Sequence, residues 1–297
     1  MSTSAVPRAT TADAKPKVFV FSHRGALGDF IMTWPALVSL RWKFSDHRFI
    51  GLGKPAYLKL AAEMGLLDEA YDCESQDFLQ FYSGDLLPRS LDGMTSALLW
   101  MEEEPKLRTL LHQKCSGPFH IHPPFPNNAQ EHAMDYHLQC LPHFALPAVP
   151  EEDLYFPIAT VRQGYALIHP GSGSKDKNYD PEFYAFLANE LKSRRYPDTR
   201  VLIGPAEQDV KSIFASRFPV MEPESPVELA RLLSQAALFV GNDSGVSHLS
   251  AILGTKTLAL FKGQNYVQWG VRGRDAHSLE AANEAQAMTR IQKALQG

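Results

Sequence analysis

Short apolar segments alternate along the chain with longer segments in which apolar residues recur every three or four positions. The short segments are typical of buried strands. They are Lys17–Ser22, Arg48–Gly53, Glu69–Cys73, Thr95–Trp100, Phe119–His122, Tyr165–His169, Arg200–Gly204, Leu238–Gly241 and Thr257–Phe261. Because helical segments separate them, the pattern predicts βαβ units, a mostly parallel arrangement and an α/β fold class with two doubly wound halves.

Helix boundaries are marked by local signals. Asp180-Pro181 combines an N-cap residue with proline at the first helical position, and Ser225-Pro226-Val227-Glu228 has the spacing of a capping box. Pro35 lies too deep for the first helical position of the segment Asp29–Lys43, so we expect it to kink that helix or to move its start. The last helix is expected over Leu279–Leu295.

The proline-rich segment Leu141–Pro157 is the best candidate for a linker between domains. We therefore expect a disordered tail over residues 1–16, a first domain over 17–155, a second domain over 156–278 and a final helical segment over 279–297. The start of the chain has no apolar h-region and is not expected to be a signal peptide.

Composition narrows the classes of function. The chain has 297 residues, with 29 Lys+Arg against 33 Asp+Glu and a net charge of −4, which argues against nucleic acid as a partner. No apolar run approaches the ~18 residues of a membrane span. The three cysteines, Cys73, Cys115 and Cys140, lie far apart in the sequence, which favours a reducing cytosol over a disulfide framework.

The first segment with candidate chemistry is His23–Phe30, where a predicted strand passes through a glycine turn into a helix. Gly25 and Gly28 allow tight backbone geometry, and the helix start offers N–H groups and a positive dipole end. Asp29 has a place from which a carboxylate can face a ligand at the strand ends. The alternative is that Asp29 only caps the helix.

The second segment, His169–Tyr179, follows another strand and has the small residues, hydroxyls and lysines that suit a diphosphate. It is not a P-loop, because the Gly-Lys-Ser/Thr element is absent. The alternative is a polar loop with solvated lysines.

The third segment, Phe239–Leu249, passes from a strand into a helix through Asn-Asp-Ser-Gly. The amides of Ser244, Gly245 and Val246 are expected at the helix start, where they form an anion site. His248 shares a helix face with Ser244. The alternative is an ordinary cap with His248 as a packed core residue.

The fourth segment, Gly204–Asp209, offers a carboxylate just past a strand, as ribose-binding sites do. The alternative, which is equally expected, is a carboxylate that only stabilises the start of a helix. The middle of the chain is rich in histidine, but His120 and His122 have no convincing second ligand pair, so no metal is expected. Gly-x-Ser-x-Gly and Gly-x-Gly-x-x-Gly are absent, which weighs against a hydrolase and a Rossmann oxidoreductase.

Together these segments resemble glycosyltransferase family 9, the ADP-heptose:lipopolysaccharide heptosyltransferase family. The resemblance is carried by Arg24-Gly25-Ala26-Leu27-Gly28-Asp29 with Pro35-Ala36-Leu37, by His169-Pro170-Gly171-Ser172 with Lys177-Asn178-Tyr179, and by Gly241–Leu249. The three motifs occur in the family's order. The resemblance implies a GT-B fold, with two Rossmann-like domains facing a cleft and the C-terminal helix packing back on the first domain.

The resemblance also implies an inverting, metal-independent transfer of heptose from ADP-heptose to a lipopolysaccharide core, with the nucleotide-sugar as co-substrate and no cofactor. Asp29 would be the general base, and Arg24, Gly25 and Gly28 would form the acceptor-side loop. Lys177 would offset charge on the leaving diphosphate. Further donor contacts would come from Ser172, Ser174, Asp243, Ser244, Gly245 and His248, and from Glu207 on the ribose, with Gln208 or Asp209 as replacements.

The sequence departs from the family at two places near the donor. Tyr179 stands where the family often has tryptophan, and Lys262-Gly263-Gln264-Asn265-Tyr266 replaces a frequent Gly-Pro-Thr. The second departure motivates one alternative, a GT-B transferase with another nucleotide-sugar. A non-catalytic nucleotide or glycan binder is the other.

Residues 74–128 match no known motif. The expected acceptor is a glycolipid, so a cytoplasmic protein with peripheral contact to the inner face of the inner membrane is consistent with the resemblance. The segment Arg41-Trp42-Lys43-Phe44 has the composition for such a contact. We favour the alternative, in which Trp42 and Phe44 simply pack in the core.

Overall fold

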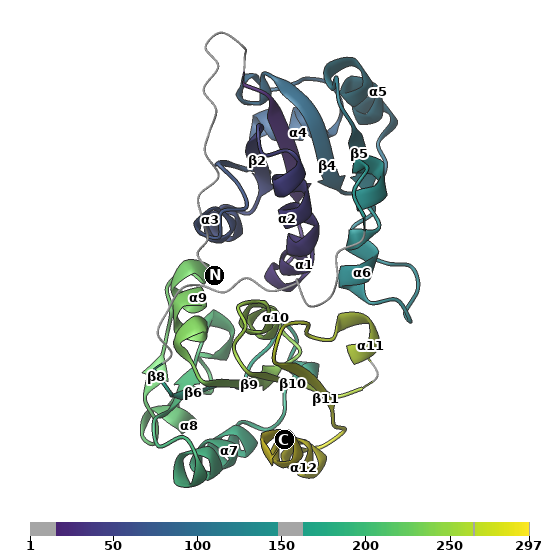
Figure 1. Ribbon diagram of the computed structural model, residues 1–297. Helices are drawn as coiled ribbons and strands as arrows, with labels where there is room; N and C mark the ends of the chain where they lie inside the picture. The colour runs from purple at the N-terminus through teal and green to yellow at the C-terminus, as the bar shows by residue number, and fades with distance from the viewer. Residues whose placement is uncertain (1–15, 148–162, 264, 297) are drawn as a thin grey trace. The chain divides into compact units, whose positions relative to one another are not determined.

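Two parallel sheets, each built from strands separated by helices, form the core of the chain (Figure 1). The structure is a computed structural model and describes residues 16–147, 163–263 and 265–296. Residues 1–15 of the expected tail, and most of the expected linker Leu141–Pro157, lie outside the described residues.

The first sheet has five parallel strands in the order β3-β2-β1-β4-β5. Its strands are β1 (Val18–His23), β2 (Arg48–Gly53), β3 (Glu69–Asp72), β4 (Met94–Trp100) and β5 (Phe119–His122). The central strand β1 is buried throughout, and its Val20 lies opposite Ile50 of β2 and Ala97 of β4. Every β1 side chain is therefore a core residue, as the apolar run predicts.

The two faces of this sheet follow the two-residue period of β1. Val18 and Val20 belong to a cluster with side chains of two helices on one face. Phe19 lies on the other face and stacks on Phe49 at a ring-centroid distance of 4.6 Å. The helices that accompany this sheet are α2 (Trp34–Lys43), α3 (Pro55–Glu63), α4 (Gln76–Tyr82) and α5 (Pro105–Lys114).

The second sheet has six parallel strands in the order β11-β10-β9-β6-β7-β8. Its strands are β6 (Ala166–His169), β7 (Thr199–Leu202), β8 (Val220–Met221), β9 (Leu238–Asn242), β10 (Thr257–Phe261) and β11 (Ala276–Glu280). The helices on the same part of the chain are α6 (Ala133–Leu138), α7 (Pro181–Arg194), α8 (Lys211–Ala215), α9 (Pro226–Gln235), α10 (Gly245–Ile252), α11 (Tyr266–Trp269) and α12 (Glu284–Gln296).

Strand β10 shows how this sheet is covered on both faces. Leu258 and Leu260 belong to a cluster with residues of α7 and α12, whereas Ala259 and Phe261 pack with Ala251 of α10. Figure 1 shows the same layering, with α7 and α12 on one side of the strands and α10 on the other. Parallel strands buried on both faces need such continuous apolar runs.

The contacts divide the chain into two compact units that are not consecutive along the sequence. The first unit takes its described residues from Met1–Arg24, Leu37–Pro124 and Cys140–Leu146. The second takes them from Gly25–Ala36, Phe125–Gln139 and Pro147–Gly297. The glycine turn and the helix that follows it, α1 (Leu27–Met32), therefore belong with the second sheet, whereas we predicted them for the first domain.

Helix α1 joins the second unit because it packs against α10 at a pair of glycines. A Cβ placed on Gly28 would lie 3.2 Å from the Cα of Gly245, and one placed on Gly245 would lie 2.9 Å from the amide nitrogen of Gly28. The two backbones are in direct contact, which only glycine permits.

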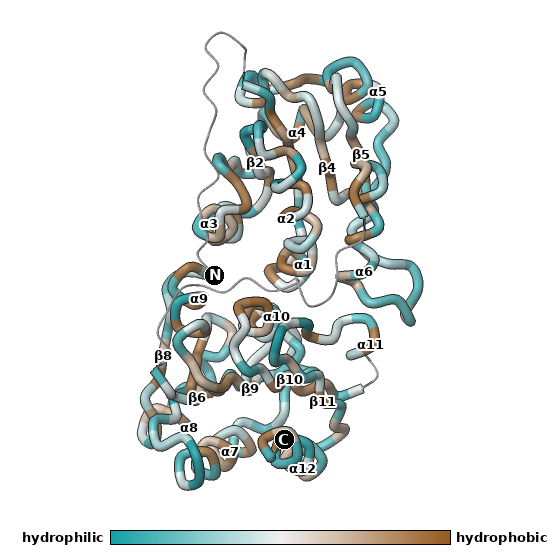
Figure 2. The backbone as a smooth tube through the Cα atoms, in the orientation of Figure 1, coloured by the Kyte–Doolittle hydropathy of each residue, from teal (hydrophilic) through white to brown (hydrophobic). Residues whose placement is uncertain are grey.

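Helix α10 is buried almost all round. Six of its eight residues, Ser247 through Ile252, are buried, since β9 and β10 cover one side and α1 packs on another. Figure 2 shows the resulting contrast between the largely hydrophobic α10 and the largely hydrophilic α12. A helix without a polar face is expected where both sides are covered.

Several local predictions are confirmed. The segment Asp29–Lys43 breaks at Thr33, and Pro35 becomes an early residue of the new helix α2, where it needs no N–H acceptor. Asp180 caps α7 by accepting a hydrogen bond from the amide of Glu182 at 2.8 Å. Ser225 caps α9 through the amide of Glu228 at 3.2 Å.

The end of the chain differs from the prediction. Residues Ala276–Glu280 form the edge strand β11, and α12 begins only at Glu284. The polar sequence of β11 hides it, because none of its side chains is fully buried. The buried residues of α12, Ala287 and Ile291, lie in the core of the second unit, and the packing of this helix on the first domain stays a prediction.

The prediction that Trp42 and Phe44 pack in the core is confirmed for one of the two residues. Phe44 is buried and contacts Phe19, with ring centroids 5.0 Å apart. Trp42 is 77% exposed, so the prediction that it packs in the core is wrong. In the part of the chain that the structure describes, no helix is both long and apolar enough to cross a membrane.

We predict that Gly245→Ala destabilises the protein by about 1–3 kcal/mol, because the new methyl group meets the backbone of Gly28 and forces α1 and α10 apart. Urea unfolding measures the effect. Gly173→Ala is the matched control, since a Cβ there has open space, and it should change stability by less than about 0.5 kcal/mol. Equal stability of the two variants would contradict the close helix packing.

A second prediction concerns His248 of α10. Burial, together with His132 and Lys177 and against the opposing effect of Asp243, lowers the pKa of His248 to about 4. The unfolded chain protonates this residue near its ordinary pKa of 6.5, so stability falls as the pH drops from about 6.5 to about 4, by about 3 kcal/mol in total.

Melting temperature measured against pH tests this. The decline below pH 6.5 should be shallower in His248→Asn than in the wild type, because the variant lacks the buried imidazole that must be protonated on unfolding. Parallel curves for the wild type and His248→Asn would show that the folded protein protonates His248 normally.

Candidate functional site

The strands β6, β9 and β10 end side by side in the second unit, and the predicted donor residues other than Glu207, which follows β7, come from the segments after β6 and β9. His169 at the end of β6 pairs with Gly241 of β9, and Asn242 of β9 pairs with Leu260 of β10. Ligands of open parallel sheets bind at this carboxyl edge. The second and third motif segments are thus neighbours in space as well as in sequence pattern.

A buried asparagine holds the loop after β6. Asn242 is fully buried, and its Nδ2 donates to the Pro170 carbonyl oxygen at 2.8 Å and to the Asn178 Oδ1 at 3.1 Å. Its Oδ1 accepts from the hydroxyl of Tyr184. Sequence reasoning singled out neither Asn178 nor Asn242 for this role. Their only signal was a place within two of the motifs.

The two predicted serines of this loop have different surroundings. Ser172 is 9% exposed, and its hydroxyl lies 2.7 Å from both the Asn178 Oδ1 and the Ser174 carbonyl oxygen, to either of which it can donate. It also accepts from the amide of Ser174 at 3.3 Å. Ser172 therefore shapes the loop, and its role as a phosphate ligand, like that of Ser174, stays a prediction.

The predicted phosphate lysine is engaged by an acidic residue of the third motif. Lys177 Nζ lies 2.6 Å from Asp243 Oδ2, and Asn265 Nδ2 donates to the same oxygen at 3.3 Å. The side chain of Asp243 is 9% exposed and that of Lys177 is 43% exposed. This pair joins the β6 loop to the start of α10 and keeps the ammonium group partly open to a ligand.

The start of α10 is the predicted anion site. Ser244 is the N-cap, and its Oγ accepts from the amide of Ser247 at 3.3 Å. Gly245 and Val246, the next two residues, have amides that helix geometry leaves without an acceptor inside the helix. A helix start carries a partial positive charge that favours a negative group beside it, and a phosphate bound at this place stays a prediction.

Asp29 lies in the first turn of α1, directly after the glycine that contacts α10. Ala26 is the N-cap of this helix, so Asp29 is not the N-cap residue itself; its Oδ2 accepts from the amide of Ala26 at 3.2 Å and holds the helix start from the third helical position. Capping does not exclude a second role, because a carboxylate has acceptor capacity for more than one donor. The turn before it contains Gly25, and Gly28 makes the helix contact.

Arg24, the other residue of the acceptor-side motif, belongs to the first unit. Its guanidinium lies 5.3 Å from the ring centroid of Tyr82, whose hydroxyl shares a 2.6 Å hydrogen bond with Ser22. The motif is therefore divided between the two units, with Arg24 in the first and Gly25, Gly28 and Asp29 in the second.

Among the three candidates for the ribose, Glu207 has the surroundings of a ligand-binding carboxylate. It is 6% exposed, packs against Gly171, and accepts from the amide of Gly204 at 2.8 Å. Asp209 is instead exposed and paired with Lys175 at 3.1 Å. Gln208 donates to Glu222 and to the Gly204 carbonyl oxygen.

A histidine that sequence reasoning did not assign stands beside Glu207. His169 Nε2 lies 3.5 Å from Glu207 Oε2, and both side chains are buried. Burial by itself raises the pKa of Glu207, but the hydrogen bond and charge of His169 and the Gly204 amide outweigh it, so the pKa is lowered overall. Glu207 is therefore a carboxylate at neutral pH.

His248 is buried in α10, and its Cδ2 would lie 3.2 Å from a Cβ on Gly28. Since its pKa is lowered to about 4, it is neutral at physiological pH. This supports the core interpretation, and a contact between His248 and the donor stays a prediction.

The two departures from the family pattern lie at this site. Tyr179 is buried and donates its hydroxyl hydrogen bond to the Ala281 carbonyl oxygen, which ties the β6 loop to the end of β11. In the other segment, Lys262 and Asn265 contact Asn178 and Asp243, respectively. The altered segment thus touches both halves of the predicted phosphate site.

The histidines of the first unit cluster without forming a ligand set. The rings of His120 and His143 stack with centroids 3.7 Å apart, and His122 Nδ1 lies 3.4 Å from His120 Nε2. Stacked imidazoles do not aim their nitrogens at one ion. Within residues 16–147, 163–263 and 265–296, no three His, Cys, Asp or Glu side chains gather as metal ligands.

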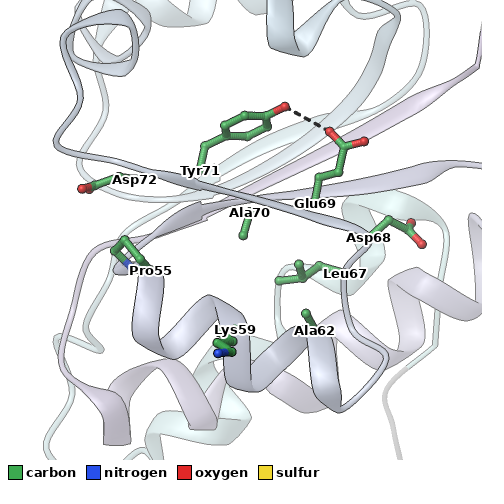
Figure 3. Close-up of a pocket in the computed structure, with 9 residues that line it drawn as sticks. All are labelled: Pro55, Lys59, Ala62, Leu67, Asp68, Glu69, Ala70, Tyr71 and Asp72. Carbon is green, nitrogen blue, oxygen red and sulfur yellow. Dashed lines mark hydrogen bonds between the residues drawn. The ribbon is translucent and has the colours of Figure 1, made fainter. Parts of the chain in front are cut away.

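A cavity of about 370 Å³ lies elsewhere, between α3 and β3 of the first unit (Figure 3). Ala70 points toward α3 in this view, while Glu69 and Tyr71 are joined by a hydrogen bond on the other side of the strand. None of the predicted site residues lines it.

Comparisons with known proteins agree with the geometry. A sequence model of glycosyltransferase family 9 (heptosyltransferase) matches residues 128–297, which is more than half of the chain. No curated protein sequence matches. The structure of E. coli heptosyltransferase WaaC with ADP has a TM-score of 0.72 at 15% identity, covering 93% of this chain and 99% of that one.

Two further structures have the same fold. The family 9 glycosyl transferase from Veillonella parvula has a TM-score of 0.76 at 15% identity and covers 94% of this chain and 97% of its own. The E. coli ADP-heptose lps heptosyltransferase II has a TM-score of 0.69 at 13% identity, with 94% and 98% covered. The predicted family, the α/β GT-B fold and the enzyme class are confirmed. With two parallel sheets of this kind and a family match over the whole second sheet, the chain belongs to glycosyltransferase family 9, the heptosyltransferase family.

Proposed function

We propose that this glycosyltransferase transfers a heptose from ADP-heptose to a hydroxyl of a lipopolysaccharide core acceptor, with inversion and without a metal. Family membership supports the reaction class. The ADP in the structure of the similar E. coli enzyme supports the nucleotide. The side chains around the strand ends of the second unit supply the charges that such a donor needs.

One observation carries the proposal: the backbone contact between Gly28 and Gly245. Asp29 follows the first glycine and Ser244 precedes the second, so the candidate base and the candidate phosphate site belong to two helices in direct contact. A base and a leaving group must lie on the two sides of one sugar carbon in an inverting transfer. Two helices in direct contact can place the base and the phosphate site on either side of a single sugar.

The leaving diphosphate is held in this proposal by Lys177 and the amides of Gly245 and Val246. Negative charge grows on the diphosphate as the bond to the sugar breaks, and fixed positive charges and dipoles lower the barrier for that step. Asp243, now paired with Lys177 at 2.6 Å, keeps the ammonium group at the edge of the strands before the donor arrives. Ser174 and His248 complete the donor side.

Asp29 is the proposed general base. The acceptor oxygen attacks the anomeric carbon, the bond from that carbon to the β-phosphate oxygen breaks, and the electron pair leaves with ADP. The acceptor proton moves to Asp29, so charge and protons balance over the step. Such a base is typically worth 10²–10⁴ in rate.

A second candidate is the same reaction with another nucleotide-sugar. Lys262 and Asn265 stand in the segment that departs from the family, and both contact residues of the proposed donor site. A changed segment at this place favours a change in the donor sugar without a change of fold.

The acceptor in this proposal is a glycolipid. Because that acceptor is part of a membrane, the proposal also gives the protein a cytoplasmic location with peripheral contact to the inner face of the inner membrane. Trp42 supports such a contact, because an indole that is 77% exposed suits the boundary between lipid and water.

We predict that Asp29→Asn lowers kcat for heptose transfer at least 100-fold and leaves the KM for ADP-heptose within a factor of about three, since the variant loses the base and keeps the donor site. Radiolabelled transfer with a purified core acceptor measures this. Asp77→Asn is the matched control, because Asp77 also lies in the first turn of a helix and is exposed. Full transfer by Asp29→Asn would rule out the mechanism.

We also predict that Glu207 recognises the ribose. Calorimetry should show that the wild type binds ADP about 10- to 100-fold more tightly than 2′-deoxy-ADP or 3′-deoxy-ADP, because one of the two hydroxyls loses a hydrogen bond to a carboxylate. Glu207→Gln should lose most of that difference, whereas Asp209→Asn should retain it. A Glu207→Gln protein that discriminates as the wild type does would place the ribose elsewhere.

A further inference from the structure

Lys262 reaches across the proposed phosphate site. It directly follows β10, yet its ammonium group donates to the main-chain oxygen of Asn178, in the loop after β6. Strand β9 lies between β10 and β6. The Lys262 side chain therefore passes over the end of β9, where Asp243 follows the strand and α10 begins.

The three lysines near this edge differ in their partners. Lys175 pairs with Asp209 at 3.1 Å, and Lys177 pairs with Asp243 at 2.6 Å. Lys262 has no carboxylate within ion-pair distance among the residues that the structure describes; its contacts there are the Asn178 carbonyl oxygen and the face of Tyr179, 4.9 Å from the ring centroid. It is thus the uncompensated cation of the group.

The charge balance makes this difference matter. Lys177 and Asp243 together have no net charge, so a diphosphate that approaches Lys177 also meets the carboxylate beside it. The helix amides contribute only a partial charge. Binding of two or three negative charges at this place calls for a second full cation, and Lys262 is the one that the fold brings there.

The position of the Lys262 ammonium is also prepared in advance. Of its three N–H donors, the carbonyl of Asn178 takes one, which leaves donors for phosphate oxygens without removing the anchor. Asn178 is itself held by Ser172 and Asn242, at 2.7 and 3.1 Å. Little reordering is needed when the ligand arrives.

We propose that Lys262 is a second diphosphate ligand, which contacts the β-phosphate of the donor opposite Lys177 and offsets the charge that develops there as the bond to the sugar breaks. The inference rests on the proposed function in that the donor is a nucleoside diphosphate sugar. It adds a catalytic residue from the segment in which this chain departs from its family. It also identifies what that segment contributes: a fixed positive charge.

The test is calorimetric binding of ADP, AMP and inorganic pyrophosphate to the wild type, Lys262→Gln, Lys262→Arg and Lys175→Gln. Lys262→Gln should weaken ADP and pyrophosphate about 10- to 100-fold and AMP much less, because AMP lacks the β-phosphate. Lys262→Arg keeps the positive charge and should retain most of the affinity. If any substitution at this position weakened binding by misfolding the protein, Lys262→Arg would lose the affinity as well. Lys175→Gln should bind all three as the wild type does.

The outcomes separate this inference from the proposed function. If the wild type binds ADP, and Lys262→Gln binds ADP and pyrophosphate as tightly as the wild type does, the inference is wrong and the donor proposal stands. If the wild type binds pyrophosphate in a Lys262-dependent way but not ADP, the inference stands and the donor has another base. If the wild type binds neither ADP nor pyrophosphate, both are wrong.

Discussion

The contact between Gly28 and Gly245 is the constraint on which the second unit depends. Because neither residue has a Cβ, the backbones of α1 and α10 meet directly, and a helix from the start of the chain becomes part of the unit built around the second sheet. Helix α10 is then covered on more than one side, so its residues are apolar or small nearly all round. The burial that follows keeps His248 neutral and sets the start of α10 at the strand edge.

A second layer of order comes from polar groups that are fully partnered. Asn242 is buried at the end of β9. Its side chain donates to the main-chain oxygens of Pro170 and Gly171 and to the side chain of Asn178, and it accepts from the hydroxyl of Tyr184. A buried amide is costly without partners, so such a network favours one conformation of the loop over its alternatives. The loop presents Lys177, and Asn178 in turn anchors Lys262. The charged groups of the site therefore depend on neutral ones that the ligand need not touch.

Much of this was readable from local patterns. Apolar runs predicted most of the strands, cap residues predicted the starts of α7 and α9, and Pro35 predicted the break between α1 and α2. The errors have a common cause. Strand β11 is polar because it lies at an edge, and the exposure of Trp42 depends on which side of α2 the sheet covers. Neighbouring elements decide both features, and no local pattern encodes them.

The amino-acid sequence determined which chemistry the chain has available: hydroxyls, lysines and carboxylates that follow strands, and glycines where the backbone must turn or approach. These are properties of short segments, set by the conformations and hydrogen bonds of adjacent residues. Tertiary structure decided which of these groups have partners. It paired Lys177 with Asp243, buried Glu207 beside His169, and left Lys262 without a carboxylate among the described residues. Residues distant in the chain make these contacts, and only the order and register of the strands bring them within reach of one another.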